Sequence, residues 1–276
     1  MAQVINTNVP SLSAQSQLSR TNSGLTQALE RLSSGKRINS SKDDAAGLAI
    51  ASRFTAQIRG YNQGTRNAAD AISLAQTAEG AYDEISGNLQ RIRELAVQSA
   101  NATNSSTDRQ ALQTEVKQLQ AEINRVSETK FNGKAVIGSS AGTFTFQVGP
   151  DNGTNDKIDV TTTKISSLGG YAAAVNTGSV SDATKAGTLI DDVDTFLQSV
   201  NTQRADLGAV QNRFDSVIRN GDNAVENLSA SRSRIEDADF AKETANLTKY
   251  QILQQAGTTV LAQANALPQS VLGLLG

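Results

Sequence analysis

The chain has 276 residues, of which 38% are hydrophobic and only 4% are aromatic, and it contains no tryptophan. Its 25 basic and 27 acidic side chains give a net charge of −2, which argues against a dedicated nucleic-acid-binding protein, because such proteins usually carry a basic excess. Cysteine and histidine are absent, which excludes disulfides, thiolate metal sites and the Ser–His triad. We therefore expect no enzyme, no cofactor and no metal site.

The sequence also bears on membranes and export. No stretch approaches the roughly 18 apolar residues that a membrane span needs, so we expect no membrane partner. Residues 1–10 lack the basic start and apolar run of a secretory signal peptide. A location outside the cytoplasm would therefore need an export route without a cleavable signal.

The first predicted helix covers residues 11–32. It begins after Pro10, a residue that favours helix starts, and Gly35 is expected to end it. Its leucines share one face: Leu18, Leu25, Leu29 and Leu32. Residues 33–42 are polar and are interpreted as a linker.

Two further helices are predicted before residue 131. One starts near Asp43 and Asp44, where acidic residues favour the first turn, and ends within residues 101–106. Its glycines weaken an isolated helix, but they would allow neighbouring chain segments to approach closely: Gly60, Gly64, Gly80 and Gly87. The next helix begins at Thr107, with Gln110 in the position of a capping box, and ends before Phe131.

The middle of the chain, about residues 131–185, is predicted to be a small β-containing insert. Asn132 and Gly133 form a favoured hairpin-turn dipeptide. Residues 143–148 alternate as a strand should, residues 149–155 form a turn cluster, and residues 158–165 are rich in threonine and prone to β structure.

The longest helical pattern follows the insert. Its apolar residues are spaced by threes and fours, which predicts one helix face buried against another helix: Ile190, Val193, Leu197, Val200, Leu207, Phe214, Ile218, Val225, Leu228 and Ile235. Four residues interrupt the pattern: Arg204, Gln211, Gly221 and Arg232. They mark either departures from a strict coiled coil or contacts with other copies. A last helix is expected over residues 238–267, ending at Pro268.

These elements predict a mainly α fold. The N- and C-terminal segments form an elongated antiparallel helical bundle or coiled coil, with a small β-hairpin-containing middle region and both termini at one end. A long amphipathic pattern without a catalytic signature indicates assembly rather than chemistry.

Several blocks of sequence resemble bacterial flagellin, and they follow the order of that family: MAQVINTNVPSL (1–12), LERLSSGKRINSSKDDAAGLAIA (29–51), LQRIRELAVQSAN (89–101), SRIEDADFA (233–241), QILQQAGTTVLAQAN (251–265) and PQSVLGLLG (268–276). The resemblance covers about residues 1–135 and 185–276. It implies a subunit that polymerises into the filament used for swimming, exported by a type III channel without a cleavable signal.

The resemblance also implies a domain division. Residues 1–42 would form the N-terminal helix and linker of the inner domain D0, and residues 237–276 its C-terminal helix. Residues 43–236 would form the rod of D1, including the insert at about 131–185. Because the middle is only about 50 residues long, we expect D0 and D1 alone, without the outer domains D2 and D3. Thin amphipathic termini bury little surface alone and are expected to fold on assembly.

The resemblance implies partners besides further copies of the chain. They are the export chaperone FliS, the filament cap and hook-associated proteins, and as host proteins the innate receptor TLR5 and the cytosolic NAIP–NLRC4 system. The receptor contacts would be Gln90, Arg91, Leu95 and Glu115, which alternatively form a solvated helix face. Inner-tube packing, chaperone binding and NAIP sensing would use Val271, Leu272, Leu274 and Leu275.

Two polar regions have open interpretations. The linker charges are either solvated or form ion pairs between subunits: Lys36, Arg37, Lys42, Asp43 and Asp44. The hydroxyl-rich middle is either a plain loop surface or a site of O-glycosylation: Thr161, Thr162, Thr163, Ser166 and Ser167. Two rival functions also remain, a hook–filament junction protein and a soluble coiled-coil binding or signalling protein.

Overall fold

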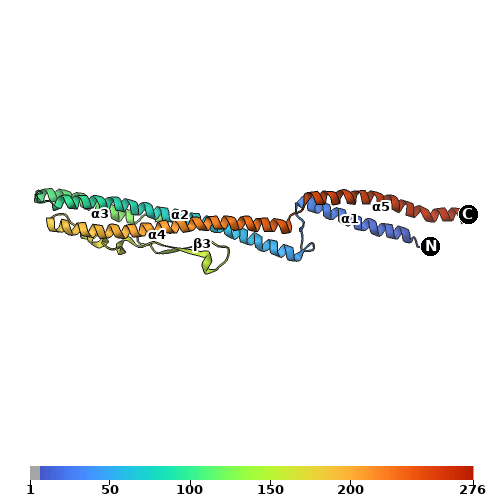
Figure 1. The fold of residues 1–276 in the computed structure, drawn as a ribbon, viewed down its shortest axis with the longest axis horizontal. Helices are drawn as coiled ribbons and strands as arrows, with labels where there is room; N and C mark the ends of the chain where they lie inside the picture. The colour runs from blue at the N-terminus through green and yellow to red at the C-terminus, as the bar shows by residue number, and fades with distance from the viewer. Residues whose placement is uncertain (1–6, 276) are drawn as a thin grey trace. The chain divides into compact units, whose positions relative to one another are not determined.

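The computed structural model describes the backbone of residues 7–275 and the side chains of residues 7–266. The chain forms two compact units, Met1–Ala56 with Asn227–Gly276, and Gln57–Glu226. Two long helices, α2 (Ala45–Ala100) and α4 (Ala183–Glu236), contribute residues to both units. The mainly α fold with long antiparallel helices and a small β-hairpin region is as predicted (Figure 1).

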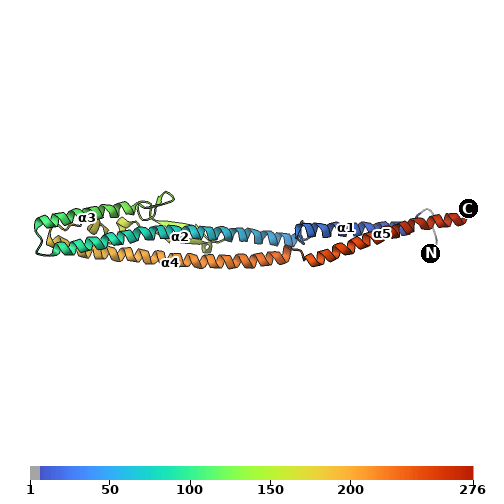
Figure 2. The ribbon, with the colours of Figure 1, turned by 90° about the horizontal axis from the view of Figure 1, so that it is seen from above.

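In the unit of residues 57–226, α2 and α4 lie side by side and antiparallel, and α3 (Ser106–Ser127) packs with them (Figure 2). The α2 face carries small residues, including Ala68, Ala71 and Ala75, all fully buried. Such residues let two helix backbones approach closely. Further along the pair, the larger Ile85 and Leu89 join the same buried cluster as Phe196. The α2–α4 part of the core is therefore a narrow helix–helix seam, and the insert adds buried residues such as Val160 and Tyr171 to the same cluster.

The apolar pattern on α4 is confirmed in part. Val193, Val200, Leu207 and Phe214 are buried as expected, but the buried set also includes Leu189 and Phe196, whereas their neighbours Ile190 and Leu197 are only half-buried. Where two apolar residues are adjacent in sequence, helical spacing is compatible with either of them being the buried one. The choice is made by the partner surface, where Tyr171 packs edge-on against Phe196 with ring centroids 5.6 Å apart.

All four interruptions of the α4 pattern lie against α2 of the same chain. Arg204 pairs with Asp83 at 3.0 Å, and Gln211 donates a hydrogen bond to Glu79 at 2.8 Å. Gly221 is buried, and a Cβ there would stand 3.1 Å from the Thr65 hydroxyl. Arg232 likewise donates to the Thr55 hydroxyl at 3.3 Å. The interruptions are therefore polar or close contacts along the helix pair, which fix how α4 lies on α2.

The start of α3 differs from the sequence prediction. The N-cap is Ser105, and its hydroxyl accepts from the Asp108 N–H while the Asp108 carboxylate accepts from the Ser105 N–H. The prediction of a capping box at Thr107 and Gln110 was therefore wrong by two residues. Aspartate at the third position replaces the glutamate or glutamine of the usual pattern, because its shorter carboxylate reaches the same N–H. The Ser105 hydroxyl also donates to the Asp108 carboxylate at 2.7 Å, and this bond, together with the one from the Ser105 N–H, lowers the pKa of Asp108.

The insert contains two antiparallel hairpins. In the first, β1 (Lys130–Phe131) pairs with β2 (Lys134–Ala135), and both Asn132 and Gly133 adopt positive φ, as the predicted two-residue turn requires. In the second, β3 (Thr143–Gln147) pairs with β4 (Lys157–Thr161). Three short helices complete the insert: η1 (Thr154–Asp156), η2 (Ile165–Ser167) and the π-helix η3 (Ala172–Asn176).

The turn after β3 is seated on α2. The Asn67 amide donates to the Gln147 carbonyl at 2.7 Å, and a Cβ at Gly60 would lie 2.6 Å from Pro150. A Cβ at Gly64 would overlap the Val148 carbonyl. By contrast, nothing lies within 4 Å of a Cβ built at Gly80 or Gly87. Of these four glycines of α2, close packing against the turn therefore explains two, Gly60 and Gly64.

This difference predicts opposite effects for one substitution at two sites. Gly64→Ala is expected to lower the free energy of unfolding by about 1–3 kcal/mol, because the turn must move off α2. Gly80→Ala is expected to raise it by up to about 1 kcal/mol through helix propensity alone. Chemical denaturation of the monomer measures both, and the account of the turn would be contradicted if the two variants shifted stability in the same direction.

In the other unit, α1 (Val9–Ser34) and α5 (Phe240–Leu275) lie side by side and antiparallel (Figures 1 and 2). The helix α1 ends at Gly35, as predicted, with a left-handed φ of 70°. The buried residues of α1 are small or polar, namely Ser11, Thr21 and Ala28. Three of the four leucines predicted to share one face are half-buried, and Leu29 is exposed. A Cβ at Gly24 would collide with the ring of Tyr250, so this seam is closely packed but thin.

The prediction that the last helix ends at Pro268 was wrong, because α5 continues to Leu275. Proline inside a helix removes one N–H and so leaves the carbonyl four residues earlier without its helical donor. Here that carbonyl belongs to Ala264, and the side chain of Asn8 donates to it at 2.9 Å. A contact from α1 therefore offsets part of what the proline costs α5.

Candidate functional site

Exposed apolar side chains are concentrated on the terminal helices. Among the residues whose side chains are described, seven of the eight large exposed hydrophobic residues lie on α1 or α5, and we call these seven the terminal apolar surface: Val9, Leu12, Leu29, Phe240, Ile252, Leu253 and Val260. Ile252 is 62% exposed and Val9 58%. Burying apolar surface contributes roughly 25 cal/mol per Å², so this surface favours association.

The terminal pair cannot bury these residues itself. Two helices share a single seam, and here small groups occupy it, with Gly257 against Leu18 and Gly24 against Tyr250. Among the described residues, large apolar side chains on the remaining faces of α1 and α5, such as Val9 and Ile252, therefore stay exposed. Such a group of exposed apolar side chains is typical of a surface that contacts other molecules.

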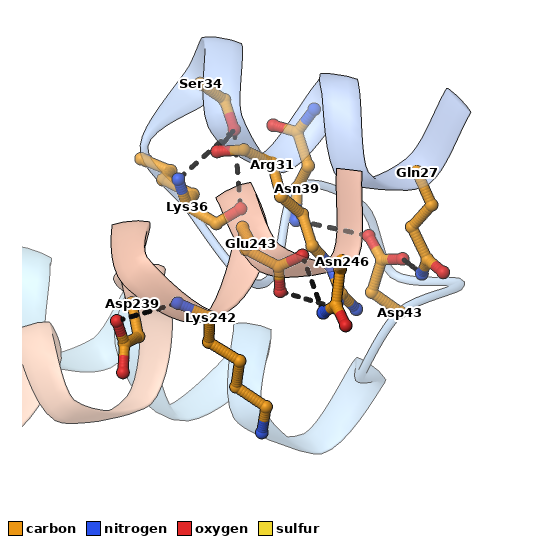
Figure 3. A network of polar contacts seen from close by, with 10 residues as sticks. All are labelled: Gln27, Arg31, Ser34, Lys36, Asn39, Asp43, Asp239, Lys242, Glu243 and Asn246. Carbon is orange, nitrogen blue, oxygen red and sulfur yellow. Dashed lines mark hydrogen bonds and ion pairs between the residues drawn. The ribbon is translucent and has the colours of Figure 1, made fainter. Parts of the chain in front are cut away.

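A polar network ties the end of α1 to the start of α5 (Figure 3). Arg31 pairs with Glu243 at 3.3 Å, and the Asn246 amide donates to the same carboxylate at 3.4 Å. The Glu243 side chain is only 7% exposed. A buried carboxylate without partners would be strongly destabilising, so these donors make Glu243 compatible with the seam.

The segment after α1 is not a loose linker. The Lys36 ammonium contacts Glu236 at 2.5 Å, and Lys36 also forms a β-bridge with Asp237. The Arg37 N–H donates to the Glu236 carbonyl at 2.7 Å. The charged groups of Lys36 and Arg37 thus have partners within the chain, but both residues stay exposed, as does Lys42, so they are also solvated.

The acidic pair that follows has a capping role. Asp43 accepts from the N–H groups of Asn39 and Ser40, and the hydrogen bond from Ser40 is the main cause that lowers the Asp43 pKa. Asp44 accepts from the Gly47 N–H at 2.8 Å, which caps the start of α2. Contacts of these charges with other subunits stay a prediction.

On the other unit, the structure brings together three of the four predicted receptor contacts. Arg91 on α2 bonds Glu94 at 3.0 Å and Glu115 on α3 at 2.8 Å, and the hydrogen bond to Glu94, followed by the one to Glu115, raises the Arg91 pKa. Gln90, Arg91 and Glu115 are exposed, and we call them the Arg91 surface. Leu95 is 1% exposed and belongs to the core, so its side chain supports this surface from beneath and does not lie on it.

The other predicted site residues are the hydroxyl residues of the insert and the C-terminal apolar residues. Thr161, Ser166 and Ser167 are exposed, but Thr162 is 3% exposed and its hydroxyl contacts Gly142, so Thr162 is removed from the candidates for glycosylation. Thr163 is half-buried. The side chains of Val271, Leu272, Leu274 and Leu275 lie outside the described residues.

Sequence reasoning missed residues that organise the terminal pair. Asn8 is the N-cap of α1 and accepts from the Ser11 N–H at 3.1 Å, a role signalled by its place just before Val9 and Pro10. The sequence around Glu243 and Tyr250 gave no sign of their roles. Glu243 is buried, and Tyr250 contacts Gly24, only because α1 pairs with α5.

No helix within the described part of the chain is apolar and long enough to cross a membrane. The same residues contain no group of three or more acidic side chains placed to hold a metal ion. The candidate functional sites of the described residues are therefore two surfaces, the terminal apolar surface and the Arg91 surface.

Comparison with known proteins gives the family. A model of the bacterial flagellin N-terminal helical region matches residues 5–141, and one of the C-terminal helical region matches residues 190–275. Flagellin of Halalkalibacterium halodurans is 46% identical over 273 residues, covering 99% of both chains. Flagellin of Xenorhabdus nematophila is also 46% identical, and the alignment covers both chains completely.

Solved structures agree. The crystal structure of Bacillus cereus flagellin matches with a TM-score of 0.50 and 31% identity, covering 56% of this chain and 88% of that one. A putative flagellar hook-associated protein from Vibrio parahaemolyticus has a TM-score of 0.60 over 71% of this chain and all of its own, but only 15% identity, so it shares the fold alone. The chain belongs to the bacterial flagellin family and is a structural subunit of the extracellular flagellar filament, not an enzyme.

Proposed function

We propose that the chain polymerises through the terminal apolar surface, with each copy covering the exposed residues of its neighbours. The observation that carries this proposal is the concentration of exposed large apolar side chains on α1 and α5. A heterologous contact that does not close into a ring extends into a helical filament. In this account residues 1–42 and 237–276 form the inner domain D0, and residues 43–236 form D1.

In this proposal, the contacts between copies that bury the terminal apolar surface stabilise the α1–α5 pair in the filament. The small-residue seam of α1 and α5 contributes little on its own, so ordering these helices depends on contacts between copies. Segments that become ordered only on assembly are suited to export through a narrow channel, because they are still unfolded when they pass through it. We propose type III export without a cleavable signal on this basis.

The C-terminal residues Val271, Leu272, Leu274 and Leu275 are proposed to pack in the inner tube and, before assembly, to bind the chaperone FliS. The apolar character of this segment supports both roles, because the chaperone would cover it until the filament does. NAIP–NLRC4 sensing of the same residues is proposed from the family resemblance. The filament cap and hook-associated proteins are proposed as partners at the filament ends.

Seeded reassembly tests the polymerisation proposal. Heat-depolymerised protein is expected to regrow long filaments on seeds, and a stable discrete oligomer would instead favour a junction protein or a soluble coiled-coil protein. Deleting residues 271–276 is expected to weaken both regrowth and binding to FliS, because it removes apolar contacts common to both. Normal filaments and unchanged chaperone binding by the truncated chain would contradict the C-terminal assignment.

We further propose that the monomer is recognised by TLR5 through the Arg91 surface. The support is geometric, since Arg91 and Glu115 come from different helices and present a joined charged pair to solvent. In the filament this surface is expected to lie between subunits, so recognition requires the monomer. O-glycosylation is retained as a proposal only for Thr161, Thr163, Ser166 and Ser167, and the intact mass of secreted protein against the calculated 29.0 kDa tests it.

A further inference from the structure

The contact between Asn8 and α5 has a chemical peculiarity. Helix carbonyls accept from the N–H four residues later, but Pro268 has no N–H, so the Ala264 carbonyl lacks its helical donor. The Asn8 amide donates to that carbonyl at 2.9 Å, while its oxygen accepts from the Ser11 N–H at 3.1 Å. One side chain therefore caps α1 and bonds the acceptor that the proline exposes on α5.

The surroundings keep this contact away from bulk water. Ala264 is 6% exposed, and so is Ser11, whose hydroxyl donates to the Asn265 side chain at 2.7 Å. A buried carbonyl without a donor costs about 1–3 kcal/mol. Asn8 thus meets a real requirement of α5, in addition to capping its own helix.

The seam between the helices needs such a fixed point. It is lined by small residues, such as Thr21, Gly24 and Ala28, and the Tyr250 ring on Gly24 is one contact that already favours the observed register. A slide by one turn would bring Asn8 opposite a carbonyl that already has a helical donor. Only the observed register brings the amide to the carbonyl freed by Pro268.

We propose that Asn8 and Pro268 form a register lock between the terminal helices. Because Pro268 has no N–H, the Ala264 carbonyl is free to accept another hydrogen bond, and the Asn8 amide of α1 donates to it. At the other end of the seam, the pairing of Arg31 with Glu243 holds the same antiparallel register (Figure 3). If the terminal helices assemble as proposed, the lock also determines which apolar residues of α1 and α5 lie next to one another where the next copy binds.

Engineered cysteines measure the register, because the chain contains none of its own. Asn22→Cys with Gln254→Cys reports the observed register, since these side chains are hydrogen-bonded at 3.0 Å. Asn22→Cys with Thr258→Cys reports a slide by one turn. The full chain is oxidised within filaments, and non-reducing gels separate intramolecular from intermolecular crosslinks. A variant that does not polymerise is measured as a minor component of filaments of the unsubstituted chain.

Three lock variants are compared with the unsubstituted lock. Asn8→Ser retains an N-cap but is too short to reach α5, Pro268→Ala restores the missing N–H, and the third carries both. Asn8→Ser is expected to lower the ratio of native to shifted crosslink about fivefold, equivalent to about 1 kcal/mol. In the Pro268→Ala background the same substitution is expected to have little effect, because the helix itself then bonds the Ala264 carbonyl.

An equal effect of Asn8→Ser in both backgrounds would overturn the lock and leave Asn8 as a cap alone, and an unchanged ratio in every variant would also overturn it. Failure of the assembly role gives a different result. The crosslink ratios can change as expected in the lock variants while the variants polymerise as well as the unsubstituted chain. That result would uphold the lock and reject its link to assembly.

Discussion

Replacing Ile252 and Val260 by serine is expected to abolish filament growth at ordinary protein concentrations. Both side chains are more than half exposed on α5, so the isolated chain loses little when they are truncated. If neighbouring copies bury them, each contributes about 2 kcal/mol to a subunit contact, and their joint loss raises the critical concentration about a thousandfold. Sedimentation of polymer over a concentration series measures this.

The matched control keeps the side chains apolar. Ile252→Leu with Val260→Leu is expected to polymerise with a critical concentration close to that of the unsubstituted chain, because the buried area hardly changes. Both double variants are expected to unfold at the same denaturant concentration as monomers. Filament growth by the serine variant at an unchanged critical concentration would show that these residues stay exposed in the filament.

Arg91→Asp is expected to abolish activation of TLR5 by the monomer. The substitution places a third acid beside Glu94 and Glu115 and removes the cation that joins α2 to α3 at the surface. Exposed ion pairs contribute little to folding, so monomer stability is expected to change only slightly. Receptor-reporter cells exposed to purified monomer give the first measurement, and thermal unfolding gives the second.

Arg93→Asp is the control for this prediction. Arg93 lies two residues away and also forms an exposed ion pair, but its partner is Asp194 on α4 at 2.7 Å and not Glu115. Its reversal changes net charge by the same amount without touching the Arg91 surface. We expect receptor activation to persist in this variant. Equal loss in both variants would indicate a general charge effect, and activation by Arg91→Asp at the usual level would reject the assignment.

Periodicity predicted the elements well where one repeated contact defines a helix. The α4 pattern and the hairpin at Asn132 and Gly133 follow from local rules, spacing in one case and turn geometry in the other. The predicted pattern placed Leu197 in the buried face, whereas Phe196 is buried instead, because that choice depends on Tyr171, which is distant in sequence. The continuation of α5 past Pro268 was equally hidden, since Asn8 supplies the compensating donor from the other end of the chain.

The candidate surfaces were predictable to different degrees. The Arg91 surface came from a resemblance in sequence, and the structure adds that Leu95 lies beneath it in the core. The terminal apolar surface was foreseen as a thin amphipathic stripe, but its members differ from that expectation. The seam took small residues such as Ala28, which left Leu29 exposed beside it. Which face of α1 is buried depends on the shape of α5, including Tyr250 over Gly24.

In the proposed filament, copies of the chain cover the terminal apolar surface of one another. Hydroxyl-radical footprinting of filament and monomer tests it directly, since oxidation reports the exposure of individual side chains. We predict that Val9, Leu12, Phe240, Ile252 and Val260 are oxidised readily in the monomer and are strongly protected in the filament. Equal oxidation of these residues in both states would contradict the claim.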